Sequence, residues 1–212
     1  MNRLLACLLL LCAPVAPALA HPHVFVSVAS EVLFAPDGKV TGVRHQWKFD
    51  DMYSAFVTAN LGTDGKDPTP EQMLPIAKTN VESLKEFDFF TYLKMGGKPA
   101  TFVDAIDYSM TYDPSDQTVT LYFTLPLEKA APAGKFFVFQ VYDPSYFVAF
   151  EMERKDPAKM TNAPAGCSLS VNKPGVLSAA DQKKLAESAG TNDSPGEDFG
   201  MKLAESVIVA CP

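Results

Sequence analysis

Residues 18–26, with the sequence ALAHPHVFV, contain side chains that could hold a metal ion. If the chain is cut after Ala20, the new N-terminus is His21-Pro22-His23, which places a free α-amine and two imidazoles within three residues. Two of the three histidines of the chain therefore lie here. An imidazole nitrogen of His21 and its own α-amine can chelate one ion, and His23 can add a second imidazole. Imidazole ligands suit zinc, copper, nickel and cobalt.

The proline between the two histidines excludes one rival arrangement. A square-planar amino-terminal copper or nickel site uses the deprotonated amide of the second residue, and Pro22 has no amide hydrogen. The remaining arrangement is a bidentate His21 with His23, completed by another side chain. The alternative is that both histidines belong to a solvated chain terminus.

Two strands must position these histidines, one over residues 23–35 and one over 39–50. They are joined by Asp37-Gly38, a strong hairpin signal. A two-residue turn there puts Phe25 opposite Asp50, on the same sheet face as His23. The sequence therefore predicts a metal site formed by His21, His23 and Asp50.

The same register separates the third histidine from this cluster. It pairs His45 with Ser30, roughly 23 Å from His23 at about 3.3 Å per residue. His45 also shares the apolar face with Trp47, so we interpret it as a structural histidine. Asp51 falls on the core side of the ladder, where the chain turns into a helix, and its participation in the site stays open.

Residues 1–20 have the organisation of a secretory signal peptide. Arg3 gives the positive start, residues 4–12 form the apolar run, and Ala18-Leu19-Ala20 fits the cleavage pattern. The run is too short to span a bilayer, which takes about 20 residues. We therefore expect residues 21–212 to form a single periplasmic domain, which would not be embedded in the membrane after cleavage.

Charge and motif content exclude several functional classes. Loss of Arg3 with the signal leaves 17 basic and 25 acidic residues, a net charge of −8. An acidic chain without basic runs argues against a nucleic-acid partner. There is no phosphate-binding loop, no nucleophilic serine motif and no arrangement typical of acid–base catalysis, so we expect no enzyme active site.

Two of the four cysteines would leave with the signal peptide. Cys167 and Cys211 remain as one pair in an oxidising compartment, which favours a disulfide that ties the C-terminus to the body of the protein. The alternative is a thiolate metal site.

The rest of the chain predicts an α+β fold. Residues 51–61 and 69–86 are expected helices, the second with Thr69 as N-cap, and residues 178–189 form a short C-terminal helix. Strands are expected near 89–95, 100–112, 118–126, 135–143, 146–154, 167–172 and 207–211. The architecture is a mainly antiparallel β-sandwich with a helical pair inserted after the first hairpin.

Two loops raise further hypotheses. Residues 60–71 have the length of an EF-hand calcium loop, with Glu71 in the last position, but too few carboxylates remain for useful calcium affinity. Residues 142–147, with the sequence YDPSYF, form a turn dense in aromatic side chains. This turn is either core and turn structure or a wall beside a binding site.

Several of these segments together resemble a known family. HPHVFV, RHQWKFDDMYSAF at 44–56, NVESLKEFDFFTY at 80–92, VYDPSYFVAF at 141–150 and the AGC…CP ending are similar to a bacterial domain-of-unknown-function family. The family is often labelled as the periplasmic component of an uncharacterised ABC-type transport system. The resemblance covers essentially the whole mature chain. It implies a periplasmic location and a context of nickel, cobalt or zinc transport, but no settled activity. Family members tend to have a fuller acidic loop at the position of residues 60–65.

Three functional hypotheses follow. The first is a periplasmic transition-metal-binding protein that delivers or buffers ions for a membrane metal transporter or ABC-type permease. The second is a copper histidine-brace enzyme for oxidative chemistry, which needs a second histidine supplied by the fold. The third is a binding module for an organic solute, which a deep cleft without clustered histidines would favour.

Overall fold

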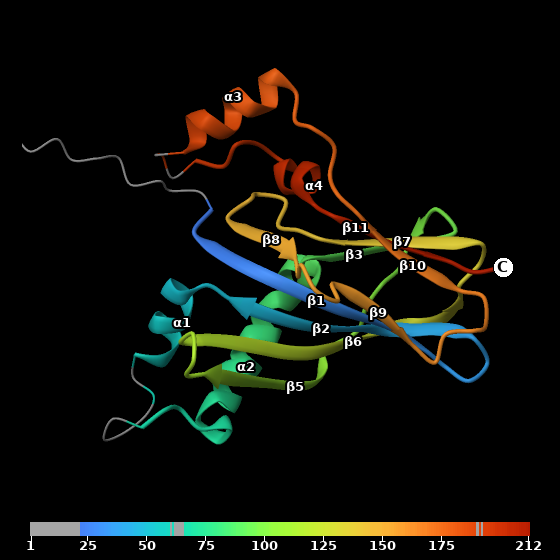
Figure 1. Ribbon diagram of the computed structural model, residues 1–212, viewed down its shortest axis with the longest axis horizontal. Helices are drawn as coiled ribbons and strands as arrows, with labels where there is room; N and C mark the ends of the chain where they lie inside the picture. Colours follow the sequence, from blue (N-terminus) through green and yellow to red (C-terminus); the bar gives the residue numbers. More distant parts are fainter. Residues whose placement is uncertain (1–21, 60, 62–65, 190, 192) are drawn as a thin grey trace, which may run out of the picture.

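Two β-sheets and their flanking helices form the fold in the computed structural model of the chain, which describes residues 22–59, 61, 66–189, 191 and 193–212 (Figure 1). The first, six-stranded sheet has the order β5-β6-β2-β1-β8, and β9 also pairs with β1. Its strands are β1 (Val24–Phe34), β2 (Lys39–Phe49), β5 (Ile106–Asp113), β6 (Thr118–Pro132), β8 (Val148–Met152) and β9 (Ala158–Thr161). The expected α+β class with two mainly antiparallel sheets is confirmed.

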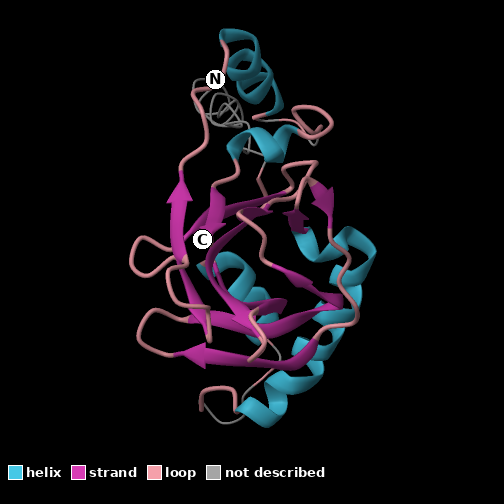
Figure 2. Cartoon of the chain, turned by 90° about the vertical axis from the view of Figure 1, so that its right-hand side faces the viewer, coloured by secondary structure: helices cyan, strands magenta, loops and turns pink. Residues whose placement is uncertain are grey.

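The second sheet is antiparallel, in the order β10-β11-β7-β3-β4. Its strands are β3 (Thr91–Met95), β4 (Lys98–Pro99), β7 (Phe136–Val141), β10 (Ser168–Asn172) and β11 (Ser206–Ala210). The helices of the described chain are α1 (Asp51–Thr58), α2 (Pro70–Leu84), the 3-10 segment η1 (Lys85–Phe90), α3 (Ala179–Ser188) and α4 (Phe199–Leu203). Figure 2 shows α2 running along one side of the strands, where it packs on β5.

The core lies between the two sheets and α2. It is made of side chains that point inward from alternate strand positions and from one stripe of α2, including Val28, Val43, Trp47, Leu121, Phe123, Phe139, Leu93, Val207, Met73 and Ala77. Burial of these apolar side chains is the main favourable contribution to folding. The predicted apolar stripe of α2 is therefore core.

The first hairpin has the predicted register over most of its length. Val26 pairs with Phe49, Ser30 with His45 and Leu33 with Gly42. The turn itself differs from the prediction, because the register shifts by one residue near Phe34, and Thr41 is left without a partner in the ladder.

The register shift is a β-bulge at Thr41, and it affects the packing of β2. Val40 and Val43 are both fully buried, although a spacing of three would put them on opposite faces of a regular strand. Gly42 is required at the bulge, since a Cβ atom there would lie 2.4 Å from the backbone oxygen of Leu125.

Both inserted helices begin where local sequence predicts. Thr69 and Gln72 form the reciprocal capping box of α2. The N-cap of α1 is Asp50. The predicted lengths were too long by a few residues at the ends, which is the usual uncertainty of helix boundaries.

Other features were not predicted. β8 and β9 pair with β1 in parallel, and the sequence did not indicate which strands of the mainly antiparallel fold would pair in this way. Residues 89 and 90, assigned to a strand in the prediction, belong to η1, where Asp88, Phe89 and Phe90 have φ of 50°, 51° and 47°. The short elements β4, β9 and α4 were missed because they are too brief to show periodicity.

The predicted disulfide between Cys167 and Cys211 is confirmed, with an S–S distance of 2.05 Å. It joins the residue before β10 to the residue after β11. Since these two strands are paired along their whole length, the disulfide closes the open end of an antiparallel pair.

Candidate functional site

His23 is attached to the fold just before β1. Its backbone N–H donates to the oxygen of Phe147 at 2.8 Å. Its imidazole lies against the ring of Phe147, with ring centroids 4.4 Å apart. The alternative of a solvated terminus therefore does not describe His23. His21 and the expected cleavage point after Ala20 lie outside the described residues.

Asp50 is held at the junction of β2 and α1. Its Oδ2 accepts the backbone N–H of Phe25 at 2.6 Å, and its Oδ1 accepts the N–H of Tyr53 at 2.7 Å. The backbone N–H of Asp50 donates to the oxygen of Phe25 at 3.0 Å, so these residues lie opposite one another as predicted. A carboxylate has about four lone-pair sites, so two hydrogen bonds leave acceptor capacity for a cation.

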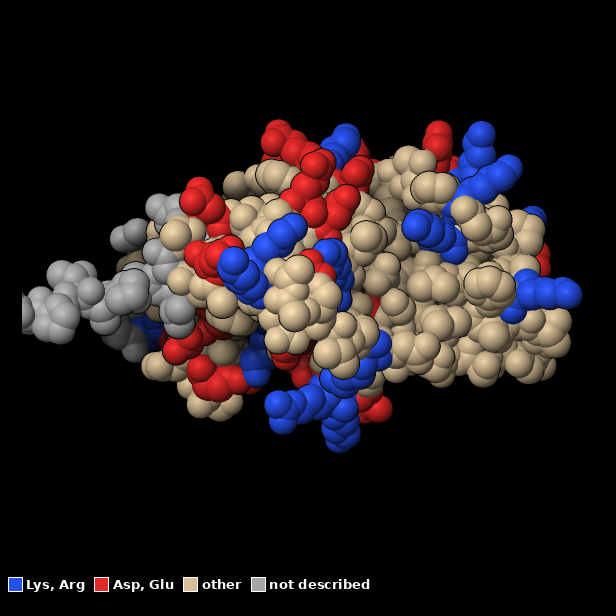
Figure 3. Space-filling model, turned by 90° about the horizontal axis from the view of Figure 1, so that it is seen from above, with Lys and Arg blue, Asp and Glu red and all other residues tan. Residues whose placement is uncertain are grey.

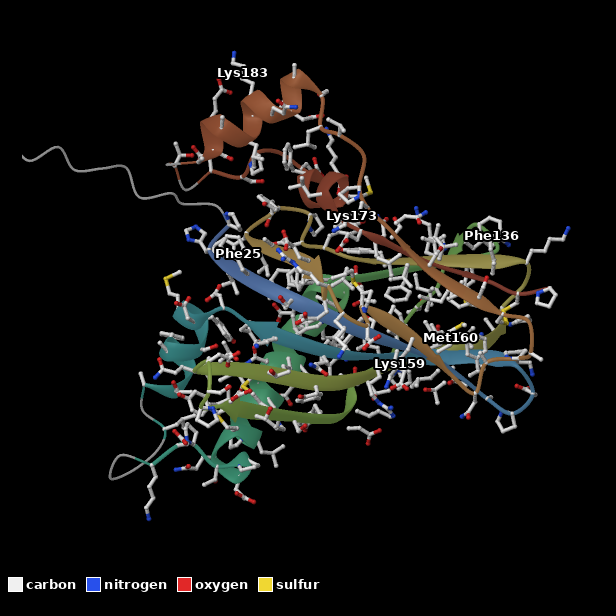
Figure 4. The ribbon with its side chains drawn as sticks, in the orientation of Figure 1. Phe25, Phe136, Lys159, Met160, Lys173 and Lys183 are labelled. Atoms are coloured by element: carbon white, nitrogen blue, oxygen red, sulfur yellow. A yellow bond between two sulfur atoms is a disulfide. The ribbon has the colours of Figure 1, made fainter. Side chains whose placement is uncertain are left out.

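The two candidate ligands therefore lie at one end of the six-stranded sheet. Phe25, labelled in Figure 4, lies near the start of β1 at the end where α1 begins. It is the partner of Asp50 and is two residues from His23. Within the described ranges, no three or more His, Cys, Asp and Glu side chains form a metal-binding group. A complete site would need His21, whose α-amine and imidazole belong to the part of the chain not described.

Asp50 has a structural role that the sequence did not predict. Its carboxylate satisfies an otherwise unpaired N–H of the first turn of α1, and a negative charge there also interacts favourably with the helix dipole. We expect Asp50→Ala to lower the free energy of unfolding by about 1–2 kcal/mol. Asp50→Asn should lower it by less than Asp50→Ala does, because its amide oxygen can still cap the helix, although its NH2 group cannot accept the N–H of Phe25. Urea denaturation of the two variants tests this, and equal losses in both would contradict a capping role.

His45 is a structural histidine. It is 1 % exposed. Its Nδ1 lies 2.9 Å from the Ser30 hydroxyl and its Nε2 lies 3.2 Å from the Thr91 hydroxyl. Since Thr91 donates its own hydrogen to the oxygen of Phe89, Thr91 accepts from Nε2–H, and Nδ1 accepts from Ser30. Burial lowers the pKa of His45 to about 3, so the ring is neutral.

Both nitrogens of His45 are thus engaged in the core, and neither is available to an ion. Because both ring nitrogens are engaged, His45 cannot serve as the second histidine of a copper brace.

Asp51 does not lie on the core side as the extended ladder implied. The ladder ends at Phe49, and Asp51 is the exposed first residue of α1, with its Oδ1 accepting the N–H of Met52 at 2.9 Å. The first three ligand positions of the hypothetical calcium loop, residues 60, 62 and 64, lie outside the described part of the chain. The expectation that calcium binds weakly or not at all stays a prediction.

The aromatic turn 142–147 borders a cavity. Asp143 organises the turn: Oδ1 accepts from the backbone N–H and the hydroxyl of Ser145, and Oδ2 accepts from the N–H of Val148. Phe147, which contacts His23, lines a cavity of about 550 Å³ together with Asp143 and Ser145. The hydrogen bonds of Asp143 agree with the interpretation as core and turn structure, and the position of Phe147 agrees with a wall beside a cavity.

The helices of the described chain include none that is both long and apolar enough to cross a membrane. On the face that Figure 3 shows, Lys and Arg side chains are interspersed with Asp and Glu.

Comparison with known proteins identifies the family. Residues 6–211 match the model of the family described as "Protein of unknown function (DUF1007)". The chain is also 23 % identical over 206 residues to an uncharacterized protein of Haemophilus influenzae, with 91 % of this chain and 92 % of that protein covered. The chain belongs to this family of unknown function.

Proposed function

We propose that the protein is an exported, periplasmic transition-metal-binding protein that delivers or buffers zinc, nickel, cobalt or copper for a membrane metal transporter or ABC-type permease. The observation that supports this proposal most is the attachment of His23 to the fold beside the Phe25–Asp50 pair. An imidazole and a carboxylate at the start of one sheet are a suitable partial ligand set for a divalent transition metal.

Each residue has a distinct role in the proposed site. His23 supplies an imidazole whose ring plane is constrained by Phe147. Asp50 supplies a carboxylate whose position is set by two backbone N–H groups, so little side-chain freedom remains to be lost on binding. After cleavage, His21 would add its α-amine and imidazole. Four donors of this kind satisfy a tetrahedral ion, and imidazole and amine must be deprotonated to bind, so binding should weaken in acid.

The test is a calorimetric titration with zinc, which does not bind through deprotonated backbone amides as copper and nickel do, of two proteins, one starting at His21 and one with a single glycine added before His21. The extra residue converts the α-amine of His21 into an amide, so affinity should fall by at least about tenfold, or 1.4 kcal/mol. Asp50→Asn, which keeps the helix cap, should also weaken binding. Equal affinity of the extended and native proteins would refute the α-amine as a ligand.

The copper-brace hypothesis receives no support from the position of His45. The organic-solute hypothesis is favoured by one specific observation, the cavity next to Phe147, which is a separate site and is treated below.

A further inference from the structure

The cavity of about 550 Å³ lies at the end of the sandwich where β1 begins. Its walls come from β1, β2, α1, the end of α2, η1, the turn before β8 and β8 itself. Seven aromatic side chains dominate these walls: Trp47, Phe49, Tyr53, Phe87, Phe90, Phe147 and Phe150. Small-molecule sites in proteins have this size and this predominantly apolar lining, with a few polar groups.

The rings form a continuous aromatic surface. The ring of Trp47 lies 4.9 Å from that of Phe150, and Phe150 lies 5.5 Å from Phe90. Phe90 in turn stacks with Phe87 at 5.4 Å and 21°. Aromatic pairs at these separations contribute beyond the area they bury, so a flat ring in the cavity would find several favourable partners.

The position of Phe87 and Phe90 depends on an unusual backbone. Three consecutive non-glycine residues, Asp88, Phe89 and Phe90, have left-handed φ values. This conformation costs roughly 1–2 kcal/mol per residue in L-amino acids. It buries Phe89 and Phe90 one after the other and leaves Phe87 53 % exposed beside Phe90. Strain of this kind is typical of functional sites, where a required side-chain position outweighs its cost.

Two polar groups of the wall are already engaged within the protein. The Asp143 carboxylate accepts three hydrogen bonds from the turn that it organises, and the Tyr53 hydroxyl donates to Asn80 at 2.8 Å. Nε1 of Trp47 has no hydrogen-bond partner among the described residues, but it is fully shielded, so a ligand in the cavity does not reach it. The wall therefore offers a ligand mainly aromatic and aliphatic surface.

We propose that this cavity binds a small molecule of low polarity that carries an aromatic ring. The ring packs against the aromatic walls. An anionic ligand is disfavoured, because the Asp143 carboxylate lies in the wall. The site is distinct from the proposed metal site, with which it shares only Phe147.

The probe for this proposal is prodan, an uncharged naphthalene with one carbonyl acceptor and polarity-sensitive emission. Because Trp47 is the single tryptophan of the chain, energy transfer from Trp47 to prodan reports occupancy of this cavity. Titration of metal-free protein in the presence of a chelator should show saturable binding of one prodan, so the result is independent of any metal.

Two leucines of α2 supply a matched pair of variants. Leu84 lines the cavity, whereas Leu74 is 48 % exposed and lies outside it. Leu84→Trp should weaken prodan binding, measured by the emission of the probe itself, at least tenfold by filling the cavity. Leu74→Trp should leave binding within twofold of the native protein. Circular dichroism confirms that both variants are folded.

The proposal is overturned if Leu84→Trp binds prodan as the native protein does, or if a straight-chain alcohol displaces prodan more effectively than naphthalene derivatives.

Discussion

Removal of the disulfide between Cys167 and Cys211 should lower the free energy of unfolding by about 4 kcal/mol. The bond closes a loop with a sequence separation of 44 residues, and opening it gives the unfolded chain more conformations. In a protein of this size, such a loss corresponds to a decrease in melting temperature of about 8–16 °C.

The folded state should survive the loss of the bond. β11 remains paired with β10 on one side and with β7 on the other, and the N–H of Cys211 donates to the oxygen of Lys135 at 3.1 Å. Thermal unfolding of the double variant Cys167→Ser/Cys211→Ser, followed by circular dichroism, measures the effect. A decrease of less than about 1 kcal/mol would contradict the loop-closure argument.

The second large effect is a loss of stability in mild acid caused by His45. In the unfolded chain, histidine takes up a proton near pH 6.5, whereas burial lowers the pKa of His45 in the fold to about 3. Between these values the unfolded state binds a proton that the folded state excludes, so stability falls as pH falls. The slope is about 1.4 kcal/mol per pH unit, which gives about 2 kcal/mol between about pH 6.5 and 5.

In this pH window, the change in stability from His45 is distinct from that of the carboxylates. The hydrogen bond with Lys48 lowers the pKa of Asp116, and that with Lys202 lowers the pKa of Asp181, so the protonation of these groups affects stability only at lower pH. Urea denaturation across the window should show the slope in the native protein and its loss in His45→Gln, which hydrogen-bonds but does not titrate. The same slope in His45→Gln would show that another group is responsible.

The features that could be predicted are those fixed by local sequence. The hairpin register follows from alternating apolar residues on both sides of Asp37-Gly38, and it correctly placed His45 opposite Ser30 and Phe25 opposite Asp50. The capping box at Thr69 was also predicted from local sequence. The disulfide between Cys167 and Cys211 followed from the cysteine content. These patterns leave few alternatives, which is why they predict well.

The features that were missed depend on distant parts of the chain. The parallel pairing of β8 and β9 with β1 brings together segments more than a hundred residues apart, and alternation within a strand does not identify its neighbour. The left-handed run at Asp88–Phe90 has no glycine to indicate it.

The candidate site was predicted only in part. The predicted register correctly placed Asp50 opposite Phe25. The role of Asp50 as the N-cap of α1 was missed, although an aspartate just before a predicted helix is a recognisable cap signal. The contact of His23 with Phe147 could not be predicted, because it joins residues 124 positions apart in the sequence. The cavity that Phe147 lines could not be predicted for the same reason, because its walls come from distant parts of the sequence.

The most direct test of the proposed metal site is the affinity of correctly cleaved protein and its His23→Ala variant for zinc, nickel and copper, measured by calorimetry. The account predicts one ion per native chain and a loss of at least about tenfold in His23→Ala, or 1.4 kcal/mol. His45→Gln should bind the metals with the affinity of the native protein, since the His45 ring is buried in the core and cannot reach an ion. If His23→Ala binds all three metals as tightly as the native protein, the N-terminal histidines do not form a metal site.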